Sequence, residues 1–173
     1  MLDTSIARSV IDHAISLGAD FAELFIERNQ INNISTLSSE VQAVQSGIDF
    51  GIGVRVVYGT KVLYGYTNRT ESDELCRIVT ELSAMDLRDP ETAVARFDFS
   101  TPNDIHHAEQ TLTKGSEVES KVEYLLKADR VARAASNMIS QTRGGCLQRE
   151  QSVEIFTSEG LHASDIRNYI RAS

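Results

Sequence analysis

Two runs of valine, leucine and tyrosine flank the tetrapeptide Tyr58-Gly59-Thr60-Lys61 in the stretch GVRVVYGTKVLYGY, residues 53–66. β-Branched and aromatic residues favour strands, and glycine readily adopts the positive φ that a tight turn requires. The stretch therefore predicts a β-hairpin. Every other element must be compatible with a sheet that contains these two strands.

Three further segments have the composition of strands. In DFAELFIER, residues 20–28, the side chains of Ala22, Leu24 and Ile26 alternate with a mixed face, which predicts a strand with one apolar side. Residues 31–51 carry β-branched residues between polar ones, and they predict one or two strands with a turn near Ser38-Ser39. Residues 138–173 are again typical of strands, with a turn at Ser158-Glu159-Gly160.

Three segments have helical spacing of apolar residues. The first is predicted over Thr4 to Leu17, after the potential caps Asp3 and Thr4 and before Gly18. The second is predicted after Thr70 as N-cap, with Asp73 at the third helical position. Its apolar face is Leu75, Ile78, Val79 and Leu82.

The third helix is predicted to open with a capping box of Ser116 and Glu119. Its expected apolar stripe is Val118, Val122, Leu125, Leu126 and Val131. Between the second and third helices, Asp86 to Gly115 contains both prolines and predicts a long connection with at most a short strand around Val94 to Phe97.

This order of elements predicts an α+β fold: a mostly antiparallel, curved sheet with about three helices packed on it. A helix, two strands and a hairpin follow one another in the first part of the chain, and a helix, a strand and a hairpin follow one another in the last part. The pattern is a loose duplication of helix-strand-hairpin units, without enough sequence identity to be called a repeat.

The overall composition narrows the class of protein. With 173 residues, 41% of them hydrophobic, the chain is long enough for one globular domain with a real core. No run approaches the length of a membrane span, and the N-terminal residues lack the pattern of a signal peptide, so we expect a cytoplasmic protein without membrane contact. The net charge of -8 disfavours direct binding of nucleic acid. Because the cytoplasm is reducing, we expect Cys76 and Cys146 to be two unpaired thiols.

The glycines of GIDFGIGVRVVYG, residues 47–59, raise the question of a phosphate-binding loop. Gly51 and Gly53 are followed by a predicted hairpin, whereas a phosphate loop needs a third glycine and a helix N-terminus. We therefore interpret these glycines as steric requirements of a bent or closely packed sheet.

Few residues are candidates for chemistry. His106, His107 and Glu109 are the tightest group of metal-competent side chains, but zinc needs three or four convergent ligands, so solvated loop residues are the favoured interpretation. We expect His13 to pack partly buried on the first helix and His162 to lie at the surface. The predicted catalytic, cofactor-binding and metal-binding residues of this chain are therefore none.

Two smaller hypotheses concern charged and sulfur side chains. Glu23 and Glu27 share a strand face, and each is expected to be solvated or salt-bridged. Glu23 is predicted to pair with Arg55 on a neighbouring strand, because each charge is embedded in an apolar run. Cys76 is expected to be a small residue of the core or its boundary.

Several segments together resemble the N-terminal domain of the TldD/PmbA family, whose members are named modulators of DNA gyrase and act as metallopeptidases. The resemblance rests most on LGADFAELFIER, on the G-x-G-V-R-V hairpin that ends at Thr67-Asn68, and on the TSEG turn at Thr157 to Gly160. That turn is similar to the family's N-S-x-G, with threonine in place of asparagine. Residues 86–115 match least.

The resemblance implies a chain of 1–173 that forms the family's N-terminal domain, ahead of a separate metal-bearing C-terminal domain. It implies zinc held there by an H-E-x-x-x-H motif and a distant cysteine, and no residue of this chain matches those ligands. It also implies short or unfolded peptides as substrates, and a homodimer or a heterodimer with a related subunit. The final residues RNYIRAS look like a strand that family members continue.

Three functions follow as hypotheses. The first is a non-catalytic domain of such a metallopeptidase, inactive alone, which contributes to dimerisation and to the walls of a peptide chamber. The second is a binding subunit or remnant, PmbA-like, that engages a partner or an extended peptide by adding a strand to a sheet edge. The third is a degenerate gene product without function.

Overall fold

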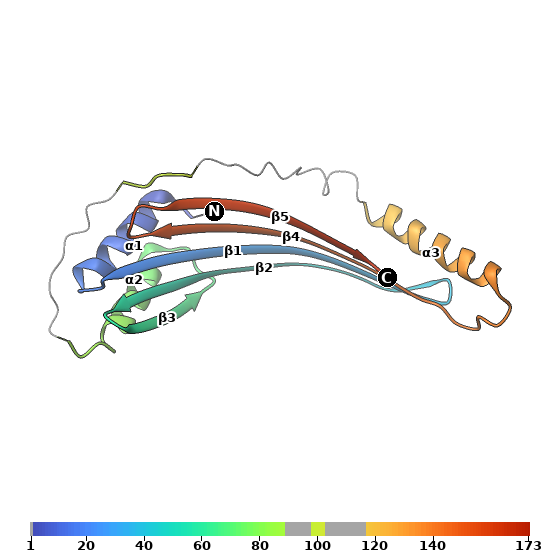
Figure 1. Ribbon diagram of the computed structural model, residues 1–173, viewed down its shortest axis with the longest axis horizontal. Coiled ribbons are helices and arrows are strands. Elements are labelled where there is room, and N and C mark those ends of the chain that lie inside the picture. The colour runs from blue at the N-terminus through green and yellow to red at the C-terminus, as the bar shows by residue number, and fades with distance from the viewer. Residues whose placement is uncertain (1, 89–97, 103–116) are drawn as a thin grey trace. The chain divides into compact units, whose positions relative to one another are not determined.

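The computed structural model describes residues 2–88, 98–102 and 117–173. Its elements follow the order α1 (Thr4–Ser16), β1 (Phe21–Leu37), β2 (Glu40–Tyr58), β3 (Lys61–Thr67), α2 (Ser72–Ser83), α3 (Val118–Ala135), β4 (Arg143–Thr157) and β5 (His162–Ala172). The strands form a sheet in the order β3-β2-β1-β4-β5 (Figure 1). The predicted α+β class with an antiparallel sheet is confirmed.

The chain divides into two compact units, which are described separately. The first unit comprises Met1–Arg28, Phe50–Ile105 and Ser152–Asp165. The second unit comprises Asn29–Asp49, His106–Gln151 and Ile166–Ser173. Strands β1, β2, β4 and β5 contribute residues to both units.

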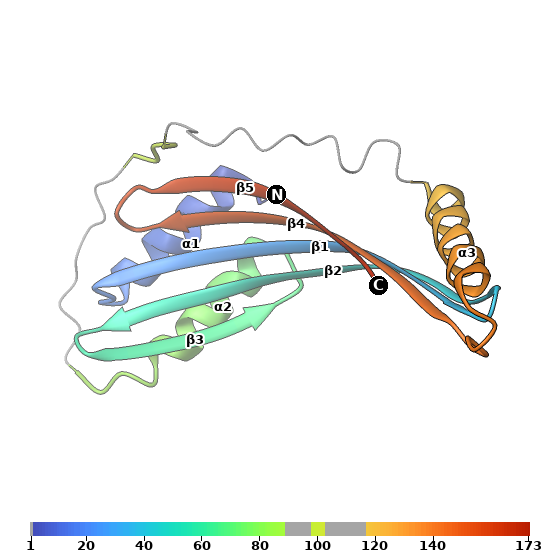
Figure 2. The same ribbon diagram turned by 45° about the vertical axis from the view of Figure 1, so that its right-hand side comes forward.

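The core of the first unit lies between α1, α2 and one face of the sheet (Figure 2). The predicted alternation in β1 is confirmed, because Ala22, Leu24 and Ile26 are buried and the residues between them are not. Alternate residues of β2 from Ile52 to Tyr58 join the same core, and β4 contributes Phe156. The largest fully buried members are Val10, Ile11, Leu24, Ile52, Val54, Val56, Leu75, Val79 and Phe156.

The predicted hairpin joins β2 to β3. Tyr58 pairs with Lys61 and Ile52 with Thr67 in an antiparallel register, and Gly59 takes the turn at φ 60°. Helix α2 follows β3 and packs closely on it: a Cβ added at Gly65 would lie 2.6 Å from Cγ2 of Ile78. The glycine therefore sets how near the helix approaches the strand.

The second unit has a smaller core. Helix α3 packs on its strands through Leu125, which meets Ile34 of β1 and Cys146 of β4, with Val118 and Val122 at the margin. Gly144 allows this approach, because a Cβ there would lie 2.6 Å from the hydroxyl oxygen of Thr36 and 3.3 Å from a methyl carbon of Leu125.

Several sequence predictions were right in kind and wrong in detail. Helix α1 begins after Asp3, whose carboxylate accepts the N–H of Ser5 at 2.7 Å, as expected for a cap. The N-cap of α2 is Glu71 and not Thr70, and that of α3 is Glu117 and not Ser116. Neither glutamate makes a side-chain cap hydrogen bond, so the helix starts are set by packing and not by capping side chains.

The strands are longer than the sequence indicated. β1 continues to Leu37 and β2 begins at Glu40, with the predicted turn at Ser38 and Ser39, both at positive φ. The turn at Ser158-Glu159-Gly160 is confirmed, with Gly160 at φ 87°. The short strand expected around Val94 to Phe97 lies outside the described residues.

One prediction for α3 is wrong. Val131, expected in its apolar stripe, is 63% exposed, whereas Lys121 and Asp129 are buried at 7% and 6%. The helix therefore turns a partly polar face inward, and its buried charges find partners on the neighbouring strands and turns.

Candidate functional site

The face of the first unit that no described helix covers carries the predicted ion pair. Nη2 of Arg55 donates to Oε2 of Glu23 at 3.0 Å, so the cross-strand hypothesis is confirmed. The guanidinium carbon of Arg55 also lies 5.2 Å from the centre of the Phe21 ring. The two charged side chains are 41% and 23% exposed, so water screens the pair.

Gly53 lies on this same face, under the ring of Tyr64. A Cβ at Gly53 would lie 2.1 Å from the hydroxyl oxygen of Tyr64, and the residue forms part of the β2–β3 ladder opposite Tyr66. Glycine here makes room for an aromatic ring from the neighbouring strand. The steric interpretation of the glycines is confirmed at this position.

A second polar group lies within the first unit, around the buried carboxylate of Glu154. Its Oε2 accepts the backbone N–H of Leu2 at 3.0 Å, and its Oε1 lies 3.0 Å from Nε2 of His162. The His162 ring stacks on Phe156 with a centroid distance of 4.2 Å. The expectation that His162 lies at the surface is wrong, since its side chain is 25% exposed and packed.

Sequence reasoning missed Glu154 for a physical reason. Its partner Leu2 is 152 residues away along the chain, and no local pattern links the two. One feature of the sequence does point to this residue: Glu154 lies two residues before Phe156, so both side chains point to the same face of β4. A carboxylate on that buried face would be costly without a partner.

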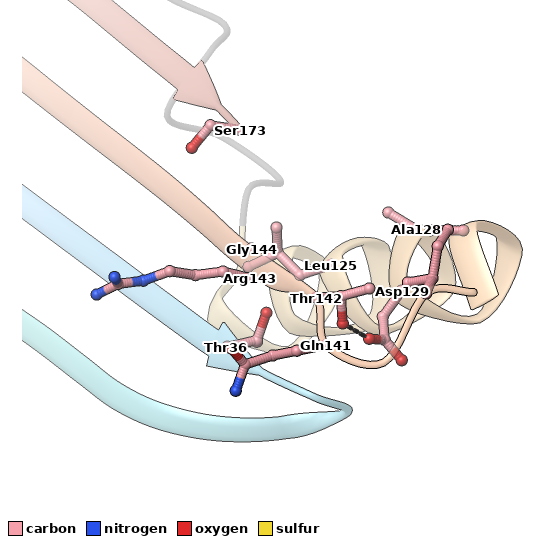
Figure 3. Close-up of a pocket in the computed structure, with 11 residues that line it drawn as sticks. Thr36, Leu125, Ala128, Asp129, Gln141, Thr142, Arg143, Gly144 and Ser173 are labelled. Atoms are coloured by element: carbon pink, nitrogen blue, oxygen red, sulfur yellow. Dashed lines mark hydrogen bonds between the residues drawn. The ribbon is translucent and has the colours of Figure 1, made fainter. Parts of the chain in front are cut away.

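The second unit contains a cavity of about 470 Å³ beside α3 (Figure 3). Its wall combines apolar and polar side chains; the lining residues are Thr36, Leu125, Ala128, Asp129, Ala132, Ile139, Gln141, Thr142, Arg143, Gly144 and Ser173. In the close-up the Arg143 side chain extends away from the carboxylate of Asp129.

Asp129 is held by three donors. Oγ of Ser39 donates to its Oδ2 at 2.5 Å, the hydroxyl of Thr142 donates to its Oδ1, and Nε of Arg133 lies 3.2 Å from Oδ1. The hydrogen bond from Ser39, together with the Arg133 pair, lowers the pKa of Asp129 below its ordinary value of 3.8. The group links α3 to the β1–β2 turn and to the start of β4.

The remaining candidates do not converge on a reaction centre. His13 is half-buried on α1, with Nε2 2.9 Å from the hydroxyl oxygen of Thr80, as expected for a packing residue. Cys76 lies at the edge of the core and Cys146 is buried, and both are free thiols, as predicted. His106, His107 and Glu109 lie outside the described residues.

No group of three or more histidine, cysteine, aspartate or glutamate side chains in residues 2–88, 98–102 and 117–173 is arranged to hold a metal ion. Among the same residues, none of the helices combines the length and the apolar run that crossing a membrane requires.

Comparison with solved structures supports the fold. A proposed modulator of DNA gyrase from Bacteroides thetaiotaomicron matches 96% of this chain with a TM-score of 0.72 and 14% identity. TldE from Thermococcus kodakarensis matches 96% with a TM-score of 0.68 and 15% identity. A proposed gyrase modulator from Thermotoga maritima matches 97% with a TM-score of 0.72 and 10% identity. This chain covers 39%, 39% and 41% of those three chains.

Sequence comparison identifies the family. The Metalloprotease TldD homolog of Haemophilus influenzae is 24% identical over 177 aligned residues, which span 99% of this chain and 36% of that protein. The chain therefore spans about a third of the length of this relative. Residues 22–85 match the PmbA/TldA metallopeptidase domain 1, and residues 114–173 match the PmbA/TldA metallopeptidase central domain. The chain belongs to the PmbA/TldD metallopeptidase family.

Proposed function

We propose that this chain is the non-catalytic, N-terminal part of a PmbA/TldD-type metallopeptidase, and that it contributes to dimerisation and to the walls of a peptide chamber. One observation carries the proposal. Two consecutive domain models of this metallopeptidase family match the chain, while the part of it that the structure describes holds no group of metal ligands.

The family's description implies a metal ion, and the described residues do not fit one. Glu154 and His162 form a pair without a third ligand, and Asp129 is surrounded by hydroxyl and guanidinium donors, which suit a carboxylate and not a metal. We therefore derive no catalytic step from these residues. The proposal places the metal, expected to be zinc, in a C-terminal domain outside residues 1–173.

Substrate and partner belong to the same proposal. We infer short or unfolded peptides as the substrates of the intact enzyme, and a second copy or a related subunit as the partner. The names of the relatives, a TldD homolog and TldE, support a partnership between related subunits. The cytoplasmic location stays a prediction from the sequence.

A cleavage assay tests the catalytic part of the proposal. The purified 173-residue chain is incubated with an unfolded protein and with short peptides, with added zinc or with a chelator. We expect no cleavage in any mixture, because no described residues can activate a metal-bound water. Cleavage that a chelator abolishes and zinc restores would overturn the non-catalytic role.

A second candidate function is a binding module that accepts an extended peptide by strand addition. The observation that favours it is the position of β3 and β5 at the two ends of the strand order. At the start of β5, Ser100 already pairs with Leu161, so β3 is the better candidate edge. Amide NMR shifts upon adding an extended peptide, concentrated in Lys61–Thr67, would support this function, and their absence there would contradict it.

A further inference from the structure

Helix α3 packs one face on the strands of the second unit through Leu125, and a second face of the helix carries large apolar side chains that are exposed. The outer face, defined here as Ser120, Tyr124, Ala128, Val131 and Ala135, recurs at helical spacing and consists of exposed residues. Tyr124 is 62% exposed and Val131 is 63% exposed. These two large side chains lie about two turns apart on the helix, and both are exposed to solvent in the part of the second unit that the structure describes.

The inward face makes this exposure unusual. Lys121 donates to the side-chain oxygen of Gln148, and Asp129 accepts from Ser39 and Thr142, so two charged residues occupy the side where tyrosine and valine are expected. A helix that buries two charged residues while it leaves an aromatic and a β-branched residue exposed has an outer face suited to a second surface.

The charges beside the outer face are segregated along the helix. Glu119 and Glu123 are exposed in the first half, and Lys127 and Arg130 are exposed in the second half. By helical geometry all four project from the same side, next to the outer face. A second α3 in antiparallel orientation therefore brings acids opposite bases.

We propose that the outer face of α3 binds the same face of a second copy of this chain, with the two helices antiparallel. In a two-fold antiparallel pair, the charged side of one helix lies beside the charged side of the other helix, with the residue order reversed. The register centred near Leu125 places Glu123 opposite Lys127 of the second copy. The same register places Glu119 opposite Arg130 of the second copy.

The apolar positions fit a register whose centre lies within about one residue of that one. It sets Tyr124 against Ala128 of the second copy and Val131 against Ser120 of the second copy, so each large side chain meets a small one. A single register thus satisfies two charge pairs and two packing pairs, each of them twice by symmetry.

The proposal deepens the dimerisation named in the proposed function and rests on it. Helix α3 is 18 residues long, about 27 Å at 1.5 Å per residue, and such a contact is small beside a standard interface. The chain is therefore expected to form a weak dimer, whose dissociation constant responds to single charges.

Charge reversal tests the register. Sedimentation equilibrium is measured on the wild-type chain and on Glu123→Lys, Lys127→Glu and the double variant. Each single reversal is expected to raise the dissociation constant about tenfold, because it places like charges opposite each other twice per dimer. The double variant is expected to return close to the wild-type value, because it restores opposite charges with their signs exchanged.

The design separates this contact from general charge effects. Glu123→Lys reduces the net negative charge and so weakens the general repulsion between two copies. That effect alone would strengthen self-association, whereas the proposal expects weaker self-association. Asp73→Lys makes the same charge change at an exposed position of α2 and is expected to leave the dissociation constant unchanged. Far-UV circular dichroism checks that every variant keeps its helices.

The outcomes are distinct. A dimer that neither single reversal weakens overturns the α3 surface and leaves dimerisation standing elsewhere on the chain. A chain that stays monomeric at about 1 mM overturns both the α3 surface and dimerisation by this part of the protein, while the cleavage assay still decides the non-catalytic role. Weakening by both single variants with recovery in the double variant supports the proposed pair.

Discussion

Nε2 of His162 lies 3.0 Å from Oε1 of Glu154, and the other oxygen of that carboxylate accepts the backbone N–H of Leu2. Glu154 is 6% exposed, so its two partners replace water for a buried group. This one residue ties the start of the chain and β5 to β4. The first unit therefore depends on a contact that spans nearly the whole sequence.

Glu154→Ala is expected to lower the free energy of unfolding by about 2–4 kcal/mol, because it leaves the Leu2 N–H and the His162 ring without an acceptor. Urea denaturation measures this. Glu154→Gln keeps a side-chain oxygen of the same size and is expected to cost less than Glu154→Ala. An alanine variant as stable as wild type would show that the contact contributes nothing.

The Glu23–Arg55 pair is expected to contribute little. Its two side chains are 41% and 23% exposed, so the coupling energy from a double-mutant cycle with alanine is expected at about 0.2–1 kcal/mol. Arg55→Lys tests the stacking on Phe21, since lysine keeps the charge but not the planar group. A coupling energy above about 2 kcal/mol would contradict the expected screening.

Two glycines of the β2–β3 hairpin are expected to differ in their tolerance of larger residues. Gly65→Ala should destabilise by about 1–3 kcal/mol, because its new methyl group meets Ile78, which is 7% exposed and fixed in the core. Gly53→Val meets only the ring of Tyr64, which is 59% exposed and able to move, so about 1 kcal/mol is expected.

The double variant Gly53→Val/Tyr64→Ala provides the control for the second site. Removing the ring removes the clash, so the valine should cost less in that background than in the wild type. Thermal unfolding of the four proteins gives the comparison. Equal costs in both backgrounds would mean that the strand itself, and not the ring, requires glycine at position 53.

Local patterns were sufficient for much of the first unit. The alternation of Ala22, Leu24 and Ile26 and the turn at Gly59 each arise from physics within a few residues, namely strand period and the φ of glycine. The Glu23–Arg55 pair was accessible for the same reason, because both charges interrupt apolar strands. The resemblance to the family rests on the same two segments and on the turn at Thr157 to Gly160.

Helix α3 was harder to predict because its inward face is decided by distant partners. Val131 is the more apolar residue, yet Lys121 and Asp129 are buried, since Gln148, Ser39 and Thr142 satisfy their polar groups. Sequence periodicity ranks residues by hydrophobicity and cannot see these hydrogen bonds. The cap positions of α2 and α3 were misplaced for a related reason: no side chain fixes them.

The carboxylate of Asp129 gives the second unit an expected pH dependence. The hydrogen bond from Ser39 comes first among the interactions that lower its pKa below the ordinary value of 3.8, and Arg133 adds to it. A carboxylate whose pKa is lower in the folded state than in the unfolded state makes its full contribution to stability at pH values above the unfolded-state pKa. That contribution disappears as the pH falls through the folded-state pKa.

Asp129→Asn removes this titration. The difference in free energy of unfolding between wild type and variant is expected to be constant above about pH 5 and to shrink as the pH falls below about 4. Urea denaturation between pH 2 and 7 measures it, and Asp73→Asn, at an exposed position of α2, provides the matched control. A difference that grows on acidification would mean that the folded chain prefers the protonated carboxyl at Asp129, against the lowering of its pKa by Ser39 and Arg133.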